Sequence, residues 1–254
     1  MQRRGTDVAD LVPALVMDDA SVTYRTFGSK RQVEGSRTPK WMQGHIGAVE
    51  YVPAVRNVSF VAHHGESIGL IGHNGSGKST LMRAMAGLVP LAGGAVYTDG
   101  RASLLGVGGA LMKDLTGERN IILGCLALGL TPKQVSERFD SVVEFADIGP
   151  SIRLPMRALS SGQAARLRFA ISTAAQPEIL LIDEALATGD AKFRKKSKER
   201  IDQIRDTAGT VVLVSHSMGT IRQTCTRALW MHRGQLRLDG GVDEVVDAYE
   251  ESLG

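Results

Sequence analysis

The sequence predicts an α/β fold in which helices cover both faces of a mostly parallel sheet. Three apolar segments of strand length, Ser67–Ile71, Ile179–Ile182 and Thr210–Val214, alternate with segments of helical periodicity. Strands buried on both faces read as continuous apolar runs, and strands that alternate with helices form parallel sheets. A glycine-rich loop directly after the first apolar segment also favours this fold, because such loops join a strand to a helix at binding sites.

Composition is typical of one domain that carries a subdomain. The chain has 254 residues, of which 43% are hydrophobic, and its net charge is only +3. Lys and Arg do not gather in a patch outside one helix, which argues against a nucleic-acid partner. Cys125 and Cys225 lie in apolar or helical segments, so we expect a reduced cytosol and no disulfide framework. We expect residues 1–13 to form a polar tail and residues 14–254 to form a single domain.

No segment of the chain is expected to span a membrane. The longest apolar stretch, Ile121–Leu130, is about half the length needed to cross a bilayer. The first ten residues, Met1–Asp10, are polar and basic and lack the apolar centre of a secretory signal. We therefore expect the chain to stay inside the cell and to reach a membrane only through a partner.

The remaining segments predict the elements around the parallel sheet. Short strands at Leu15–Tyr24 and Ala54–Phe60 indicate a small antiparallel β subdomain, with residues 28–53 inserted between them. Thr116 fits an N-cap for an inserted helical subdomain at about residues 113–160. Further expectations are a helix at Lys78–Leu88, strand segments within Ala95–Leu105, helices at about Gly162–Ala175 and Phe193–Arg205, and a final β–β–helix segment ending near Leu253.

The strongest functional signal is the segment Gly72–Thr80 (GHNGSGKST), which fits the phosphate-loop pattern G-x-x-x-x-G-K-[ST] between a strand and a helix. Glycines let the backbone turn its N–H groups toward phosphate oxygens, and the helix N-terminus adds a positive dipole end. Lys78 is expected to reach the β- and γ-phosphates of ATP, and Ser79 to ligate Mg²⁺. The binding residues expected from this motif are His73, Asn74, Gly75, Ser76, Gly77, Lys78, Ser79 and Thr80.

Two adjacent acids follow the apolar strand Ile179–Ile182. Asp183 and Glu184 emerge at the carboxyl end of this strand, which is where open α/β sheets place their sites. By themselves they read equally well as a pair of loop carboxylates. Beside a phosphate loop, Asp183 is expected to hold Mg²⁺, and Glu184 to orient and polarise the attacking water.

A third motif, Leu159–Gln163 (LSSGQ), opens a helix. Ser and Gly before a helix can be no more than an N-cap. These residues also resemble the signature loop of ABC ATPases, in which the pattern is L-S-G-G-Q. The resemblance implies that Ser160, Ser161, Gly162 and Gln163 bind the γ-phosphate of ATP held by the other subunit of a homodimer.

Three further residues take roles from the same resemblance, which covers nearly the whole chain. Asp190 occupies the place of the family's D-loop between subunits. His216 follows the next strand, where the family has a switch histidine that contacts the γ-phosphate. Tyr24 resembles the aromatic residue that stacks on adenine, although a Tyr that ends an edge strand is often a packing residue.

Several details resemble the branch of the family that exports O-antigen, teichoic acid or cell-wall glycans. Ser161 replaces the first glycine of the signature loop, as is habitual there. A Gln that the wider family uses as a Mg²⁺ ligand is missing near Leu105, and Val107 lies at about its place, as is frequent in that branch. The other similar segments are Leu115–Asn120, Gly189–Lys196 and Gly241–Glu250.

The insertion at residues 28–53 is also similar to one found in that branch, where it is thought to lie near the mouth of the transport channel. Arg37, Lys40 and Trp41 would then be interfacial groups. The alternative is a loop with one packed Trp. Some relatives append a carbohydrate-binding domain, and its absence from this sequence leads us to expect export of a glycan without recognition of its end.

The resemblance thus implies an ATPase subunit, dependent on ATP and Mg²⁺, that drives a lipid-linked polysaccharide across the cytoplasmic membrane. It would work as a homodimer on the cytoplasmic face of that membrane, bound to two copies of a separate permease. One alternative is the motor subunit of another ABC transporter, such as a lipid exporter or an importer. A soluble ABC ATPase that acts on nucleic acid usually carries two cassettes or a long coiled coil, and this sequence has neither.

Overall fold

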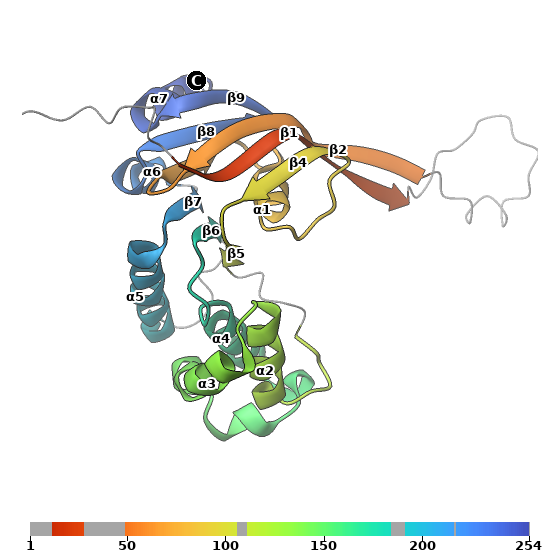
Figure 1. Cartoon of the computed structure of the whole chain (residues 1–254), viewed down its shortest axis with the longest axis vertical. Coiled ribbons are helices and arrows are strands. Elements are labelled where there is room, and N and C mark those ends of the chain that lie inside the picture. Colours follow the sequence, from red (N-terminus) through yellow and green to blue (C-terminus); the bar gives the residue numbers. More distant parts are fainter. Residues whose placement is uncertain (1–11, 28–48, 106–110, 184–190, 216, 254) are drawn as a thin grey trace, which may run out of the picture.

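The computed structural model describes residues 12–27, 49–105, 111–183, 191–215 and 217–253. These residues form two β-sheets, with helices beside the sheets and a separate group of helices at one end of the molecule (Figure 1). The architecture confirms the predicted α/β fold with a mostly parallel core sheet. No helix within the described ranges is long and apolar enough to cross a membrane.

The core sheet has six strands, and all except the last lie parallel to their neighbours. Its central strands are almost completely buried, which explains their continuous apolar sequences. Because the strands are parallel, the loops that follow them meet at one edge of the sheet. The strand order is β5 (Ala102–Leu105), β6 (Ile179–Asp183), β7 (Thr210–Val214), β3 (Ser67–Ile71), β8 (Arg227–His232) and β9 (Gln235–Gly241).

The antiparallel sheet has the order β2 (Val49–His63), β1 (Pro13–Phe27) and β4 (Gly93–Thr98). Strands β1 and β2 have 15 residues each and pair along their whole length, from Pro13 with His63 to Phe27 with Val49. Their far ends project beyond the rest of the molecule (Figure 1).

The prediction of two short strands here was wrong in length. Residues 49–53, which the sequence placed in the insertion, belong to β2. Several register shifts interrupt the pairing, and Asp19 and Asn57 have positive φ values of 48°. Bulges of this kind break the alternation of apolar and polar residues, so the sequence pattern shows only the central part of each strand.

Side-chain caps define the starts of several helices. Thr116 caps one helix, as predicted, and Ser160 caps another through a capping box. Thr131, which the sequence did not indicate as a cap, caps a third helix through a capping box. The helix after the phosphate loop ends at Met85, three residues before the predicted end. Gly87 has a positive φ of 67°, and the Leu88 N–H donates to the Arg83 carbonyl oxygen, which is the Schellman pattern of helix termination.

The helices are α1 (Lys78–Met85), α2 (Gly117–Ala127), α3 (Pro132–Ala146), α4 (Ser161–Ser172), α5 (Ala191–Thr207), α6 (Met218–Thr224) and α7 (Val242–Glu251). Two short 3₁₀ helices, η2 (Gly149–Arg153) and η3 (Met156–Ala158), lie between α3 and α4. The sequence did not predict α6, which has seven residues and shows too few turns for a clear periodicity.

The separate helical group has a hydrophobic core of its own, to which Ile121, Val142, Leu167 and Ile171 contribute. Within this group, Asn120 of α2 is only 1% exposed and folds the preceding loop back onto the helix. Its amide nitrogen donates to the carbonyl oxygens of Met112, Leu115 and Thr116, and its side-chain oxygen accepts from the Met112 N–H at 2.7 Å. Asn120 thus gives the Met112 N–H its acceptor and adds a second hydrogen bond to three carbonyl oxygens that also accept from backbone N–H groups, which ties the loop to the start of α2.

We expect Asn120→Ala to lower the free energy of unfolding by about 2–3 kcal/mol, because it removes the four hydrogen bonds by which a buried amide ties the preceding loop to α2. Chemical denaturation monitored by circular dichroism measures this loss. Lys133→Ala is the control, because the Lys133 side chain is 87% exposed, and we expect it to change stability by less than about 0.5 kcal/mol. Equal losses in the two variants would contradict the role assigned to Asn120.

Candidate functional site

The phosphate loop lies between the end of β3 and the start of α1, where the sequence predicts it. Gly72, Gly75 and Gly77 have φ values of 140°, 78° and 102°, a region that side chains other than glycine rarely adopt. A Cβ atom on Gly77 would lie 2.5 Å from the Ala54 carbonyl oxygen of β2, and one on Gly72 would overlap the Met231 carbonyl oxygen of β8. These glycines therefore permit close packing of the loop between two strands.

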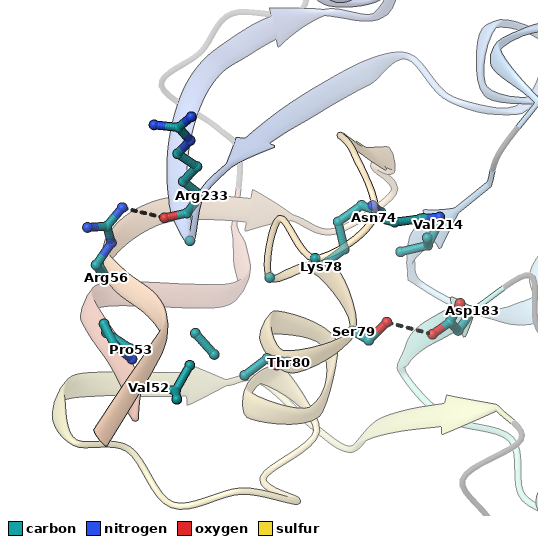
Figure 2. A pocket seen from close by; sticks show the side chains of 14 residues that line it. Val52, Pro53, Arg56, Asn74, Lys78, Ser79, Thr80, Asp183, Val214 and Arg233 are labelled. Atoms are coloured by element: carbon teal, nitrogen blue, oxygen red, sulfur yellow. Dashed lines mark hydrogen bonds between the residues drawn. The ribbon is translucent and has the colours of Figure 1, made fainter. Parts of the chain in front are cut away.

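Backbone hydrogen bonds complete this enclosure of the loop. The Gly234 N–H, in the turn between β8 and β9, donates to the Ser76 carbonyl oxygen at 2.9 Å. The Arg56 N–H of β2 donates to the Gly234 carbonyl oxygen at 2.7 Å, and the Arg56 guanidinium donates to the Arg233 carbonyl oxygen (Figure 2). One turn thus joins β2 to the phosphate loop.

Lys78 is held inside the loop at the first position of α1. Its ammonium group donates to the carbonyl oxygens of Gly72 and His73 at 2.6 and 2.8 Å. Burial lowers the pKa of Lys78 below its usual value, and the negative charge of Asp183 partly offsets this effect. A positive charge that is partly removed from water, at the N-terminus of a helix, favours an anion at this place.

Ser79 and Asp183 meet at the same edge of the core sheet. Asp183 is the last residue of β6, and the Ser79 hydroxyl lies 3.3 Å from its Oδ2 atom (Figure 2). Hydroxyl and carboxylate oxygens are ligands that Mg²⁺ accepts, usually together with waters and substrate phosphates. Among the described residues, no group of three or more His, Cys, Asp or Glu side chains is arranged to hold a metal ion, so an ion bound by Ser79 and Asp183 would need waters or phosphate oxygens as further ligands.

The loop, Asp183 and β2 enclose a cavity of about 640 Å³. This volume falls within the ~300–1,000 Å³ of small-molecule sites. Val52 and Pro53 of β2 form one wall, and Arg56 and Arg233 lie at its margin (Figure 2). The predicted residues that line the cavity are Asn74, Gly75, Gly77, Lys78, Ser79, Thr80 and Asp183.

Three predicted residues lie beside the cavity and do not line it. His73 packs edge-to-face on Tyr249, with 5.6 Å between ring centroids, and Ser76 is 4% exposed. Tyr24 is partly buried, and its hydroxyl lies 3.4 Å from Thr80 Oγ1. Tyr24 pairs with Val52 across β1 and β2, so the strand pairing places Val52 in the wall of the cavity.

Comparison with known protein families identifies the family to which these site residues belong. A family model described as "ABC transporter" matches residues 55–187, a range that includes the phosphate loop, the LSSGQ segment and Asp183. The chain belongs to the ABC transporter family. This match confirms the resemblance to ABC ATPases that the sequence motifs indicated.

Two curated proteins illustrate the relationship of this ABC chain to exporters. "Teichoic acids export ATP-binding protein TagH" of Listeria monocytogenes is 44% identical over 198 residues, which cover 78% of this chain and 59% of that protein. "O-antigen export system ATP-binding protein RfbB" of Klebsiella pneumoniae is 38% identical over 201 residues, which cover 79% and 82%. The chain thus spans less than two thirds of the Listeria protein's length.

Solved structures show the same fold at lower identity. A dimeric structure of a post-hydrolysis state of an ATP-binding cassette, bound to ADP and phosphate, superimposes with a TM-score of 0.64 and 20% identity, covering 90% of this chain and 98% of that one. An ATP-binding subunit of an ABC transporter gives a TM-score of 0.66 at 20% identity, covering 93% of both chains. These similarities confirm the predicted ABC ATPase fold.

The four residues predicted to form the signature loop lie at the start of α4, in the helical group. Ser160 accepts a hydrogen bond from the Gln163 N–H at 3.2 Å, and Gln163 Oε1 accepts from the Ser160 N–H at 3.0 Å. Gln163 Nε2 also donates to Ser151 at 3.1 Å. Ser160, Ser161, Gly162 and Gln163 do not line the described cavity, so this chain brings them to a different surface.

Other predicted residues lie outside the described part of the chain. These are Glu184, Asp190 and His216, together with Val107 and the insertion residues Arg37, Lys40 and Trp41. Conversely, the sequence did not indicate Val52, Pro53, Arg56 and Arg233, which line the cavity. The only sequence signal for any of these is the Arg233-Gly234 pair, since a glycine after a polar residue marks a hairpin turn.

We expect Gly77→Ala to lower the free energy of unfolding by about 1–3 kcal/mol more than Gly75→Ala does. Both glycines have positive φ, so both variants carry backbone strain of about 1–2 kcal/mol. Only at Gly77 would the added methyl group meet a backbone atom, whereas no atom lies within 4 Å of a Cβ at Gly75. Urea denaturation without nucleotide measures both values, and equal losses would contradict the close packing of Gly77 against β2.

Proposed function

We propose that this chain is the ATP-hydrolysing subunit of an ABC exporter that drives a lipid-linked polysaccharide across the cytoplasmic membrane. The observation that carries ATP binding is the cavity in which the phosphate loop, Lys78 and Ser79 face Asp183. Support for the cargo comes from the relatives named for export of teichoic acids and of O-antigen.

The phosphate chain of ATP fits along the loop backbone, next to the Lys78 ammonium group and the N-terminus of α1. Ser79 and Asp183 supply oxygens for Mg²⁺, which when bound neutralises charge on the phosphate oxygens. The nucleoside part has room beside Val52 and Pro53, which form an apolar wall. Tyr24 reaches the same region from β1, and stacking of its ring on adenine remains our prediction.

Hydrolysis requires a group that orients the attacking water. Glu184 directly follows Asp183, so the proposed base and the proposed metal ligand share the carboxyl end of β6. We assign His216, which follows β7 by two residues, to contact with the γ-phosphate. Strand β7 lies between β6 and β3 in the core sheet, an order that favours convergence of these three loops.

A homodimer explains why the signature loop lies away from the chain's own cavity. In the proposed dimer, the start of α4 in one copy faces the γ-phosphate held by the other copy, and Asp190 lies between the subunits. The Ser160 and Gln163 side chains already satisfy each other's backbone, so the helix start is preformed. We place the dimer on the cytoplasmic face of the membrane, bound to two copies of a separate permease.

We expect Glu184→Gln to lower the turnover of ATP by about 10²–10⁴-fold, because the amide cannot accept a proton from water. Steady-state phosphate release measures the loss. ATP binding should persist and should trap a dimer, which light scattering after size exclusion detects. Glu199→Gln, on the exposed face of α5, is the control and should leave turnover unchanged. A monomer at all ATP concentrations would contradict the dimeric mechanism.

We expect the subunit, when co-purified with its permease, to hydrolyse ATP several-fold faster in the presence of a lipid-linked glycan. The measurement compares proteoliposomes with and without the glycan, for wild type and for Glu184→Gln. Activity that depends on Glu184 and responds to the glycan supports polysaccharide export. Activity that depends on Glu184 but ignores every glycan tested would retain the ATPase and contradict the proposed cargo.

A further inference from the structure

A second polar cavity is lined by residues of α3, of the loop that follows α4, and of α5. These elements lie near the junction of the helical group and the core (Figure 1). Its volume is about 230 Å³. That is below the ~300–1,000 Å³ of sites for drug-sized ligands, but it exceeds the ~30 Å³ of one water several times. Its dimensions therefore suit a small ion with a few waters. Arg138 of α3 and Arg200 of α5 both line it.

Both arginines bind carbonyl oxygens at the end of α4. The Arg138 guanidinium donates to the Ala174 carbonyl oxygen, and the Arg200 guanidinium donates to that of Thr173 at 3.1 Å. A helix C-terminus supplies only about half a negative charge. Two full positive charges face it, so more than one unit of positive charge is left without compensation from this helix.

Described carboxylates do not supply the missing negative charge. No Asp or Glu occurs among the described residues that line the cavity. Glu137 of α3 lies 4.0 Å from Lys133, and Asp202 of α5 lies 3.3 Å from Arg205. Burial lowers the pKa of Arg200, and the charge of Arg138 lowers it further. Both effects are expected where two cations repel each other in a site that is partly shielded from water.

Hydrogen-bond donors also remain unused in this cavity. The Nε atom of Arg200 is buried, and no described residue accepts a hydrogen bond from it. The Ser141 and Thr207 hydroxyls already donate to backbone carbonyl oxygens. The remaining donors on the lining are therefore the two guanidinium groups and the exposed amides of Gln176 and Gln203.

We propose that this cavity binds a tetrahedral oxyanion of the phosphate class, held by Arg138 and Arg200. Planar guanidinium groups bind phosphate oxygens through paired charge-assisted hydrogen bonds, which a single ammonium group cannot provide. The bound anion joins α3 and the end of α4 to α5, and so stabilises the contact between the helical group and the core. This site is separate from the phosphate loop and requires neither Lys78 nor Glu184.

The test is the thermal unfolding of the full chain in sodium phosphate, compared with sodium chloride at equal ionic strength. Lys78→Ala serves as the parent, so that the phosphate loop contributes least. We expect saturating phosphate to raise the Tm of the parent by about 2–5 °C. Arg138→Gln or Arg200→Gln, added to the parent, should abolish the rise. Lys198→Gln, which removes one charge from the exposed face of α5, should retain it.

A parent whose Tm does not respond to phosphate would overturn the proposal. A rise that persists in both arginine variants, or that Lys198→Gln abolishes equally, would overturn it too, because it would reflect general screening of charge. If Arg200→Gln fails to fold, Arg200→Lys retains the charge and loses the planar fork, and should need about ten-fold more phosphate for the same rise. None of these outcomes depends on ATP hydrolysis, so they do not bear on the proposed ATPase.

Discussion

The phosphate loop is enclosed by backbone atoms from segments that are far apart in the sequence, and the rest of the site depends on this enclosure. Carbonyl oxygens of β2 and β8 approach the loop so closely that Gly77 and Gly72 cannot carry a Cβ atom without displacement. The Gly234 turn then links the loop to β2 by backbone hydrogen bonds. Because these contacts are between backbones, they fix the loop regardless of surface side chains, and they join the antiparallel sheet to the core sheet where the cavity opens.

Electrostatics at the site follow from that enclosure. The Lys78 ammonium group is held by two carbonyl oxygens of its own loop and is partly removed from water. Asp183 lies close enough to stabilise its charge and also contacts Ser79. A cation and a carboxylate arranged in this way prepare one place for phosphate and an adjacent one for a divalent ion. The parallel order of β6, β7 and β3 brings these groups together without any long-range sequence signal.

Local motifs made much of this site predictable from the sequence. The phosphate loop, Asp183 and the cap at Ser160 are each defined by neighbouring residues, so a single segment identifies them. The wall formed by Val52 and Pro53 depends on how β2 pairs with β1, and bulges hide that register. The backbone contacts of Arg56 with the β8–β9 turn likewise exist only after the sheets assemble. Residues 184–190 and His216 lie outside the described structure, so their roles remain sequence-based predictions.

The complete pairing of β1 and β2 has a consequence for how this fold varies in evolution. Phe27 and Val49 are partners in the ladder, so the chain leaves the hairpin and returns to it at adjacent points. Closing a loop between such fixed ends costs free energy that grows only with the logarithm of its length. Sequence can therefore be gained or lost between these two residues at little cost to stability and with no shift in the cavity's walls. Changes in this segment can therefore alter the surfaces that the molecule presents to partners without altering the residues that bind nucleotide.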